Sequence, residues 1–368
     1  MYIHLPWCVR KCPYCDFNSH TTDVLPEAAY VASLLRDLEK DLPWVDQRVV
    51  HTVFFGGGTP SLFSGGAIAA ILQGLTARIP LAPDTEVTLE ANPGTVDEAH
   101  FAAYRAAGVN RLSLGVQSFS DDALRRLGRV HGAAEARRAV ALARGVGFEQ
   151  INLDLMYGLP GQAPGAMLTD LTEAMALQPT HLSWYQLTLE SGTAFAHRPP
   201  PLPAEDRVAD EAEAGLSLLA QAGYARYEVS AYARPGAQCR HNLNYWTFGD
   251  YLGLGAGAHG KITTPQGILR TLKRRHPQAY LKDAGSTGEI TPVAEADLVI
   301  EFMLNALRLT DGFSLELFTR HTGLPVSALT PGLDLAQARG WVVLADSRVR
   351  PTPPGYRFLN DLTALFLP

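Results

Sequence analysis

Residues 2–17 read YIHLPWCVRKCPYCDF and place three of the chain's four cysteines, Cys8, Cys12 and Cys15, at CxxxCxxC spacing. Thiolates clustered this tightly are typical of a metal or iron–sulfur site. A structural zinc or an electron-transfer [4Fe–4S] cluster takes four protein ligands. Three cysteines without a nearby fourth therefore favour a [4Fe–4S] cluster with one open iron, which can bind a small molecule.

Two other uses of these cysteines stay open at this point. A disulfide could join two of them and leave an odd thiol, or His4 or His20 could complete a zinc site. Four cysteines in 368 residues, three of them clustered, fit a reducing compartment better than a disulfide scaffold.

The length and charge of the chain limit its class. A chain of 368 residues exceeds one typical domain, so we expect a catalytic barrel with an appended domain. The net charge of −6 gives no broad basic field, which argues against nucleic acid as a partner. No signal peptide is evident and no apolar run reaches the length of a membrane span. We therefore expect a cytoplasmic protein, whose association with membranes would be peripheral.

Short apolar runs alternate with longer amphipathic stretches in the first half of the chain. The expected strands are residues 2–5, 49–55, 86–91, 111–116, 150–156 and 181–187. The expected helices are residues 26–42, 66–78, 97–107, 133–145 and 166–177. This alternation predicts an α/β fold of parallel strands joined by right-handed crossovers. In such folds binding sites form at the carboxyl ends of the strands.

Glycines or polar side chains follow the second to fifth of these strands. The stretch Gly56–Pro60 reads GGGTP, and its glycines allow a ligand to approach the backbone closely. Glu90, Gln117 and Asp154 stand at the next strand ends, and Arg129 follows in a loop where it could pair with a carboxylate. Together they predict one shared pocket. The alternatives are a phosphate-binding or plain turn for the glycines and a solvated loop acid for Glu90.

A second motif lies at residues 239–246, which read CRHNLNYW. The imidazole of His241 could ligate haem iron, the rings of Tyr245 and Trp246 could stack on a macrocycle, and Asn242 could bond a propionate. A loop of packing aromatics around a hydrogen-bonded histidine is the alternative. Two further candidates are weaker: Cys239 is more simply a small packed side chain, and His259 lies in a glycine-rich stretch.

Beyond about residue 270 the pattern changes. Residues 270–276 form a basic run that we expect to be a solvated linker face. Short helical patterns and a two-stranded ribbon then predict a small α+β, winged-helix-like C-terminal domain, in which no basic recognition face indicates DNA binding. We expect a barrel at 1–230, a motif-bearing segment and linker at 231–290, and the C-terminal domain at 291–368.

The cysteine spacing, with an aromatic residue before the third cysteine, resembles the radical S-adenosylmethionine (SAM) superfamily. In that family the open iron chelates the amino and carboxylate groups of SAM, and an electron from the cluster cleaves SAM to methionine and a 5′-deoxyadenosyl radical. The resemblance implies a partial (β/α)6 TIM-like barrel and a [4Fe–4S] cluster held by Cys8, Cys12 and Cys15.

The order and spacing of the motifs are similar, more narrowly, to the oxygen-independent coproporphyrinogen III oxidase group over about the first two hundred residues. This resemblance implies that SAM is bound by residues of β-strand ends and loops: Tyr2, Tyr14, Phe17, Gly57, Gly58, Thr59, Glu90, Gln117, Arg129 and Asp154. No side chain is assigned a catalytic role.

Three features resemble the HemW-type haem chaperones of this group. The oxidases have a further cysteine at the position where this chain has Phe17. They also have a long segment before their first cysteine, whereas the first cysteine of this chain is residue 8. The HNLNYW stretch matches the HNxxYW motif of the chaperones. The resemblance implies a protein that binds haem and delivers it to recipient haem proteins such as respiratory enzymes. The alternatives are oxidative decarboxylation of coproporphyrinogen III to protoporphyrinogen IX and radical chemistry on an unrelated substrate.

Overall fold

The computed structural model describes residues 1–283 and 288–368. Within these residues the main sheet has nine strands, in the spatial order β11 (Gly253–Leu254), β1 (Tyr2–Leu5), β4 (Val50–Gly57), β5 (Leu81–Ala91), β6 (Arg111–Gln117), β7 (Gln150–Tyr157), β8 (His181–Gln186), β10 (Ala231–Ala233) and β9 (Ala225–Glu228). Neighbouring strands are parallel from β11 to β8, and the last two are antiparallel. The predicted parallel α/β core is confirmed.

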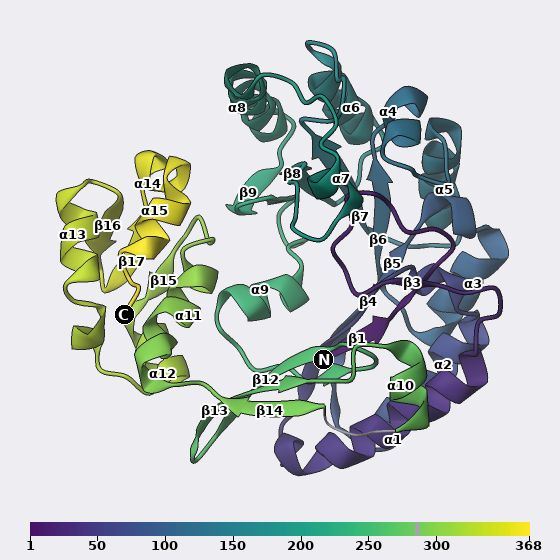
Figure 1. Cartoon of the computed structure of the whole chain (residues 1–368), viewed down its shortest axis with the longest axis horizontal. Coiled ribbons are helices and arrows are strands. Elements are labelled where there is room, and N and C mark those ends of the chain that lie inside the picture. Colours follow the sequence, from purple (N-terminus) through teal and green to yellow (C-terminus); the bar gives the residue numbers. More distant parts are fainter. Residues whose placement is uncertain (284–287) are drawn as a thin grey trace.

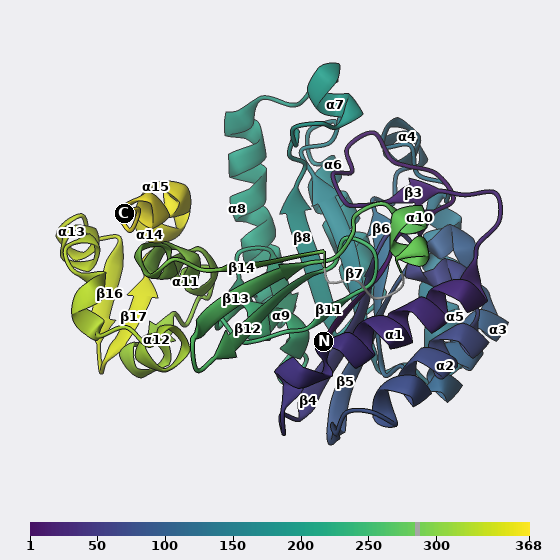
Figure 2. The same cartoon turned by 60° about the horizontal axis from the view of Figure 1, so that its bottom comes forward.

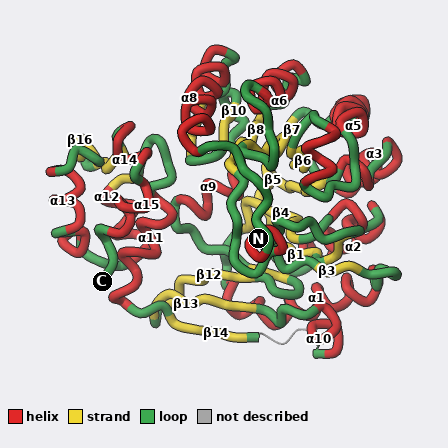
Figure 3. The backbone as a smooth tube through the Cα atoms, turned by 45° about the horizontal axis from the view of Figure 1, so that its top comes forward, coloured by secondary structure: helices red, strands yellow, loops and turns green. Residues whose placement is uncertain are grey.

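Helices cover the outer side of this curved sheet (Figures 1 and 3). They are α1 (Glu27–Val45), α2 (Gly65–Thr76), α3 (Glu98–Ala107), α4 (Asp121–Arg126), α5 (Ala133–Gly145), α6 (Ala166–Ala176) and α8 (Glu205–Gln221). Helix α3 shows how the sequence sets their ends. The Asp97 carboxylate accepts a bond from the His100 backbone N–H, and Gly108 ends the helix at a φ of 109°.

Strand side chains alternate between the helix layer and the barrel interior. On β4, Val53 and Phe55 belong to the apolar core beneath the helices, whereas Thr52 bonds across the interior. On β7, Leu153 is wholly buried in that core, whereas Asp154 faces a cavity. The same alternation on β5, β6 and β8 makes the inner face polar, and this inner face carries the site.

The chain after β8 differs from the sequence prediction in two places. The alternating pattern of residues 224–233 predicts a single strand, but these residues form two antiparallel strands, β9 and β10. The basic run at 270–276 is not a solvated linker, because it begins in β13 (Gly267–Leu272) and its Lys273 is buried between two carboxylates. β13 pairs antiparallel with β12 (His259–Thr264) and β14 (Glu289–Pro292), as Figure 2 shows.

Shorter elements complete the barrel side of the molecule: β2 (Trp7–Cys8), β3 (His20–Thr21), α7 (Ala194–His197), α9 (Arg240–Trp246) and α10 (Pro277–Lys282). The expected 231–290 segment thus contributes strands to two sheets. Its residues 284–287 lie outside the described residues.

The C-terminal part has its own apolar core. Its elements are α11 (Leu298–Ala306), β15 (Phe313–Ser314), α12 (Leu315–Thr322), α13 (Gly332–Ala338), β16 (Val342–Ala345), β17 (Arg348–Pro351), α14 (Pro353–Arg357) and α15 (Leu359–Ala364). Phe302 packs edge-to-face against Phe313 and Phe318, and Phe248, which follows α9, joins the same core. The expected helices and ribbon are present. Among the described residues, no helix is long and apolar enough to cross a membrane.

Candidate functional site

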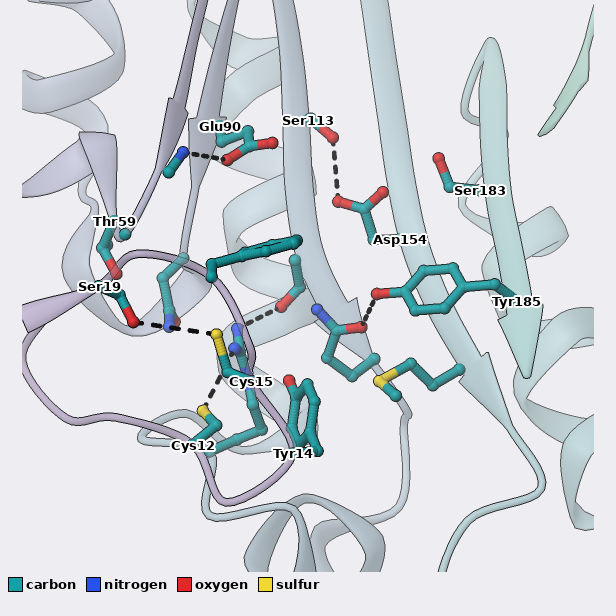
Figure 4. Close-up of a pocket in the computed structure, with 18 of the residues that line it drawn as sticks. Cys12, Tyr14, Cys15, Ser19, Thr59, Glu90, Ser113, Asp154, Ser183 and Tyr185 are labelled. Carbon is teal, nitrogen blue, oxygen red and sulfur yellow. Dashed lines mark hydrogen bonds between the residues drawn. The ribbon is translucent and has the colours of Figure 1, made fainter. Parts of the chain in front are cut away.

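The three clustered cysteines face one cavity at the carboxyl ends of the strands. Cys8, Cys12 and Cys15 are free, partly exposed thiols that line a space of about 560 Å³. Figure 4 shows Cys12 and Cys15 at this space. The Thr59 hydroxyl donates to Cys8 Sγ at 3.4 Å, and Ser19 Oγ lies 3.9 Å from Cys15 Sγ. Burial raises the pKa of the Cys8 and Cys15 thiols. Iron binding, which needs thiolates, would therefore release protons here.

The chemistry of this donor set fits an iron–sulfur cluster better than the alternatives. The disulfide is absent, since all four cysteines lie in the described part of the chain and are free. His4 does not complete a zinc site, because its ring nitrogens contact Tyr2 Oη at 3.0 Å and the Asn18 carbonyl at 2.8 Å. His20 bonds the Asn18 side chain at 3.1 Å. Three cysteines on one loop can each hold a separate iron of a [4Fe–4S] cluster.

The glycines of the GGGTP stretch allow close packing of β4 against the cysteine loop. Gly57 has a φ of 118°, and a Cβ there would lie 2.6 Å from His4 Cε1. A Cβ on Gly58 would lie 2.5 Å from the Trp7 carbonyl oxygen. Both glycines also line the cavity, where the Gly57 N–H donates to Glu90 Oε2 at 3.3 Å. The motif therefore shapes one wall of the cavity.

Two carboxylates, Glu90 on β5 and Asp154 on β7, face the same space from either side of β6 (Figure 4). Burial, reinforced by the charge of Asp154, raises the pKa of Glu90 to about 8. Burial also raises the pKa of Asp154, although its carboxylate accepts bonds from Ser113 Oγ at 2.9 Å and Asn152 Nδ2 at 2.8 Å. Neither carboxylate has an ion-pair partner among the described residues. A cationic or hydroxyl-rich ligand would supply the missing partners.

Arg129 is a partly buried positive group that lines the cavity. Its Nη2 donates to the Gly115 carbonyl at 2.8 Å and its Nη1 lies 3.9 Å from Cys12 Sγ. Its Nε is buried without a hydrogen-bond partner among the described residues. The guanidinium thus keeps a donor for a ligand carboxylate. Arg129 and Asp154 form no direct ion pair, although a buried acid such as Asp154 needs either a guanidinium or ligand hydroxyls as partners.

Gln117 and the aromatic residues complete the lining. Gln117 takes a left-handed φ of 71° and accepts a bond from Tyr185 Oη at 2.9 Å. Tyr14 and Phe17 line the cavity, and the Phe17 side chain is 60% exposed. Tyr2 does not line this cavity. It lines a second, adjacent cavity of about 410 Å³, which shares Glu90 and Gly57 with the first.

Several lining residues were missed by the sequence prediction: Ser113, Met156, Ser183 and Tyr185. Met156 stands two residues after Asp154 on β7, Ser113 stands four residues before Gln117 on β6, and Ser183 and Tyr185 on β8 pair with Asp154 and Met156. The detectable signal was period-two alternation, because side chains that share a strand face recur every second residue.

The HNLNYW stretch forms helix α9 on the inner side of the sheet (Figure 1). His241 is 1% exposed. Its Nδ1 contacts Thr52 Oγ1 at 2.9 Å, its Nε2 contacts Tyr245 Oη at 2.8 Å, and its ring stacks on Phe54 at 4.9 Å. Burial holds the pKa of His241 well below its usual value. Both ring nitrogens are therefore occupied in this arrangement.

The other motif residues point to different places. Asn242 lines the first cavity and Tyr245 the second. Trp246 lies under the Arg308 guanidinium, 4.2 Å from it, and its indole N–H has no partner among the described residues. Cys239 is buried, with its thiol 3.7 Å from Glu86 Oε1. The structure brings the cysteine loop and the strand-end residues together, but does not gather the four motif side chains on one cavity.

Comparison with known proteins gives the class first. Residues 2–174 match the radical SAM superfamily, and residues 293–358 match the HemN C-terminal domain. The solved structure of coproporphyrinogen III oxidase (HemN) from Escherichia coli superimposes with a TM-score of 0.84, at 21% identity, over 99% of this chain and 89% of that one. The fold is that of a radical SAM protein.

Relatives that align over the whole of this chain identify the family within the radical SAM proteins. Heme chaperone HemW of Escherichia coli K12 is 51% identical over 369 residues, which cover 100% of this chain and 97% of the relative. Heme chaperone HemW of Haemophilus influenzae is 49% identical over 373 residues, with coverage of 100% and 97%. The chain belongs to the HemW family.

Proposed function

We propose that this protein is a haem chaperone, which binds haem and delivers it to haem proteins such as respiratory enzymes. The observation that carries this proposal is the 51% identity, over the whole chain, to a relative named as a haem chaperone. The likeness to the oxidase HemN, at 21% identity, concerns the fold alone. Phe17, which stands where the oxidases have a cysteine, also favours the chaperone.

The cofactors proposed are a [4Fe–4S] cluster and SAM in the larger cavity. Cys8, Cys12 and Cys15 would hold the cluster, which supplies an open iron and an electron when bound. The free donor of Arg129 suits the SAM carboxylate, and the unpaired Glu90 suits its ammonium or a ribose hydroxyl. Asp154 and Gln117 would hold the remaining polar groups.

The remaining residues of the proposed site form the walls around the cofactors. Gly57, Gly58 and Thr59 close the side against the cysteine loop, Tyr14 and Phe17 come from that loop, and Tyr2 lies beside Glu90. Haem is proposed as cargo next to α9, near His241, Asn242, Tyr245 and Trp246. The division at residues 230 and 290 and a cytoplasmic location remain part of the proposal.

A single series of measurements tests the function. The cluster-reconstituted protein is titrated with haem without oxygen, and the same sample then receives coproporphyrinogen III, SAM and a reductant. Stoichiometric haem binding, transfer to an apo-cytochrome and no protoporphyrinogen IX are the expected results. Turnover of coproporphyrinogen III with weak haem binding would overturn the proposal in favour of the oxidase.

A further inference from the structure

The second cavity is built for a flat aromatic ligand. It encloses about 410 Å³, within the range of small-molecule sites, and its walls include the rings of Tyr2, Phe17, Tyr245 and Tyr251. Tyrosine and phenylalanine rings stack on extended π systems. Asp16, Phe17, Gly57 and Glu90 line both cavities, so a molecule bound here would lie directly beside the proposed cofactor site.

One histidine in this cavity is free to bind a metal. His259 begins β12, is exposed, and its imidazole makes no hydrogen bond within residues 1–283 and 288–368. Burial and the nearby Arg270 and Arg275 lower the pKa of His259. The neutral imidazole, the form that ligates iron, is therefore the main form at neutral pH.

The cavity also offers a cation for an acidic ligand. Arg275 lines it, is exposed, and has no ion-pair partner for its guanidinium in the described part of the chain. Arg270, by contrast, is paired with Glu301 and contacts Tyr251 Oη at 3.2 Å. A porphyrin carries carboxylates at one edge, and a free guanidinium suits such a group.

A buried ion-pair cluster holds the backbone that leads into His259. Lys273 Nζ lies 2.6 Å from Asp37 Oδ1 and 2.7 Å from Asp41 Oδ2, and Asp37 Oδ2 accepts a bond from the Gly255 N–H at 3.1 Å. The Lys273 N–H donates to the Ala258 carbonyl at 2.9 Å. This buried cluster fixes the backbone that leads into His259, and β12 pairs with β13 from His259 onward, so the imidazole is placed before a ligand arrives.

The motif histidine has a different position. Its two ring nitrogens bond Thr52 and Tyr245, and ligation of iron would break at least one of these buried bonds. The Tyr245 ring that His241 holds forms part of the second cavity's wall. His241 is thus placed to position Tyr245 and not to reach the ligand itself.

We propose that haem binds in the second cavity with His259 as its axial ligand and Arg275 at a propionate, while His241 positions Tyr245. This inference rests on the proposed haem-chaperone function and adds the iron ligand. The iron ligand is then a residue of β12, and helix α9 contributes only to the wall of the cavity.

The test compares ligand-swapped variants of the full, cluster-reconstituted chain. Haemin is titrated without oxygen, and absorption, magnetic circular dichroism and electron paramagnetic resonance report the axial ligand. The variants are His259→Ala, His259→Met and His241→Ala, with His51→Ala, an exposed histidine on β4 outside the second cavity, as the matched control. Circular dichroism checks that each variant folds.

The expected results separate the two histidines. His259→Ala should weaken haem binding about tenfold or more and remove the histidine signature, and His259→Met should replace it with a thioether signature. His241→Ala and His51→Ala should keep the histidine signature, with weaker binding only for His241→Ala. Unchanged spectra in both His259 variants, or loss of the signature in His241→Ala or His51→Ala, would overturn the assignment. No haem binding by the parent protein would instead overturn the proposed function itself.

Discussion

The Glu86 carboxylate accepts the backbone N–H of His241 at 3.1 Å and so anchors the motif helix α9 to the inner face of β5. Its other oxygen accepts the Arg240 N–H at 3.2 Å and lies 3.8 Å from Arg111 Nη1. Arg111, on β6, is 3% exposed. One acidic side chain therefore caps the helix and neutralises a buried guanidinium.

We expect Glu86→Ala to destabilise the protein by roughly 3 kcal/mol, because it leaves Arg111 buried without its counterion and α9 without its cap. Urea unfolding followed by tryptophan fluorescence measures this change. Glu86→Gln, which keeps an acceptor oxygen, should cost clearly less. Equal unfolding midpoints for Glu86→Ala and the parent would show that the helix needs neither contact.

The sequence could predict the parallel core and the cysteine loop, because both depend on local patterns. Period-two strands, crossover helices and CxxxCxxC spacing are all readable from neighbouring residues. The strand-end residues Glu90 and Asp154 could also be placed at one rim, since parallel strands end on the same side.

The surroundings of the motif could not be predicted in the same way. The polar and aromatic neighbours of His241 in sequence suggest that its imidazole is free to bind a ligand. In the structure, however, Thr52 on β4 bonds its Nδ1 and Phe54 stacks on its ring, and both lie nearly two hundred residues earlier in the chain. Lys273 looked solvated within a basic run, but its two carboxylate partners lie on α1. Such long-range partners leave no local pattern.

Glu90 gives a pH prediction for SAM binding. Because burial and Asp154 raise the pKa of Glu90 to about 8, it is protonated and neutral at pH 6.5 in the ligand-free protein. A cationic ligand binds better to the carboxylate, so affinity should rise as the pH approaches 8, by up to about tenfold. Equilibrium dialysis of SAM with the cluster-loaded protein between pH 6.5 and 8 measures this. Glu90→Gln should bind SAM more weakly, with a flat profile; a parent profile as flat as that of the variant would contradict the assignment.

Gly57 should tolerate no side chain. With a φ of 118° and a Cβ position 2.6 Å from His4, Gly57→Ala must displace either β4 or the strand that leads into the cysteine loop. We expect lower iron content after reconstitution and weaker SAM binding. Gly66→Ala is the matched control, because its nearest neighbour would be Ser64 Oγ at an ordinary 3.7 Å. Full iron incorporation by Gly57→Ala would show that the backbone around residue 57 can shift without disturbing the cluster site.

The cysteines divide into three that face the cavity and one that does not. Cys8 lines the cavity and accepts a bond from Thr59, whereas Cys239 is buried at the N-terminal end of α9, beside Glu86. Burial raises the pKa of the Cys239 thiol to about 12, which leaves it protonated and a poor iron ligand.

We therefore expect Cys8→Ala to fall short of four irons per chain after anaerobic reconstitution, and Cys239→Ala to retain all four. Iron and sulfide analysis with the cluster's visible absorption distinguishes the two variants. Because Cys239→Ala removes the same thiol group at a buried position, it also controls for a general effect of losing a cysteine. A full cluster in Cys8→Ala would show that the iron sites depend on other ligands and that the CxxxCxxC loop has another purpose.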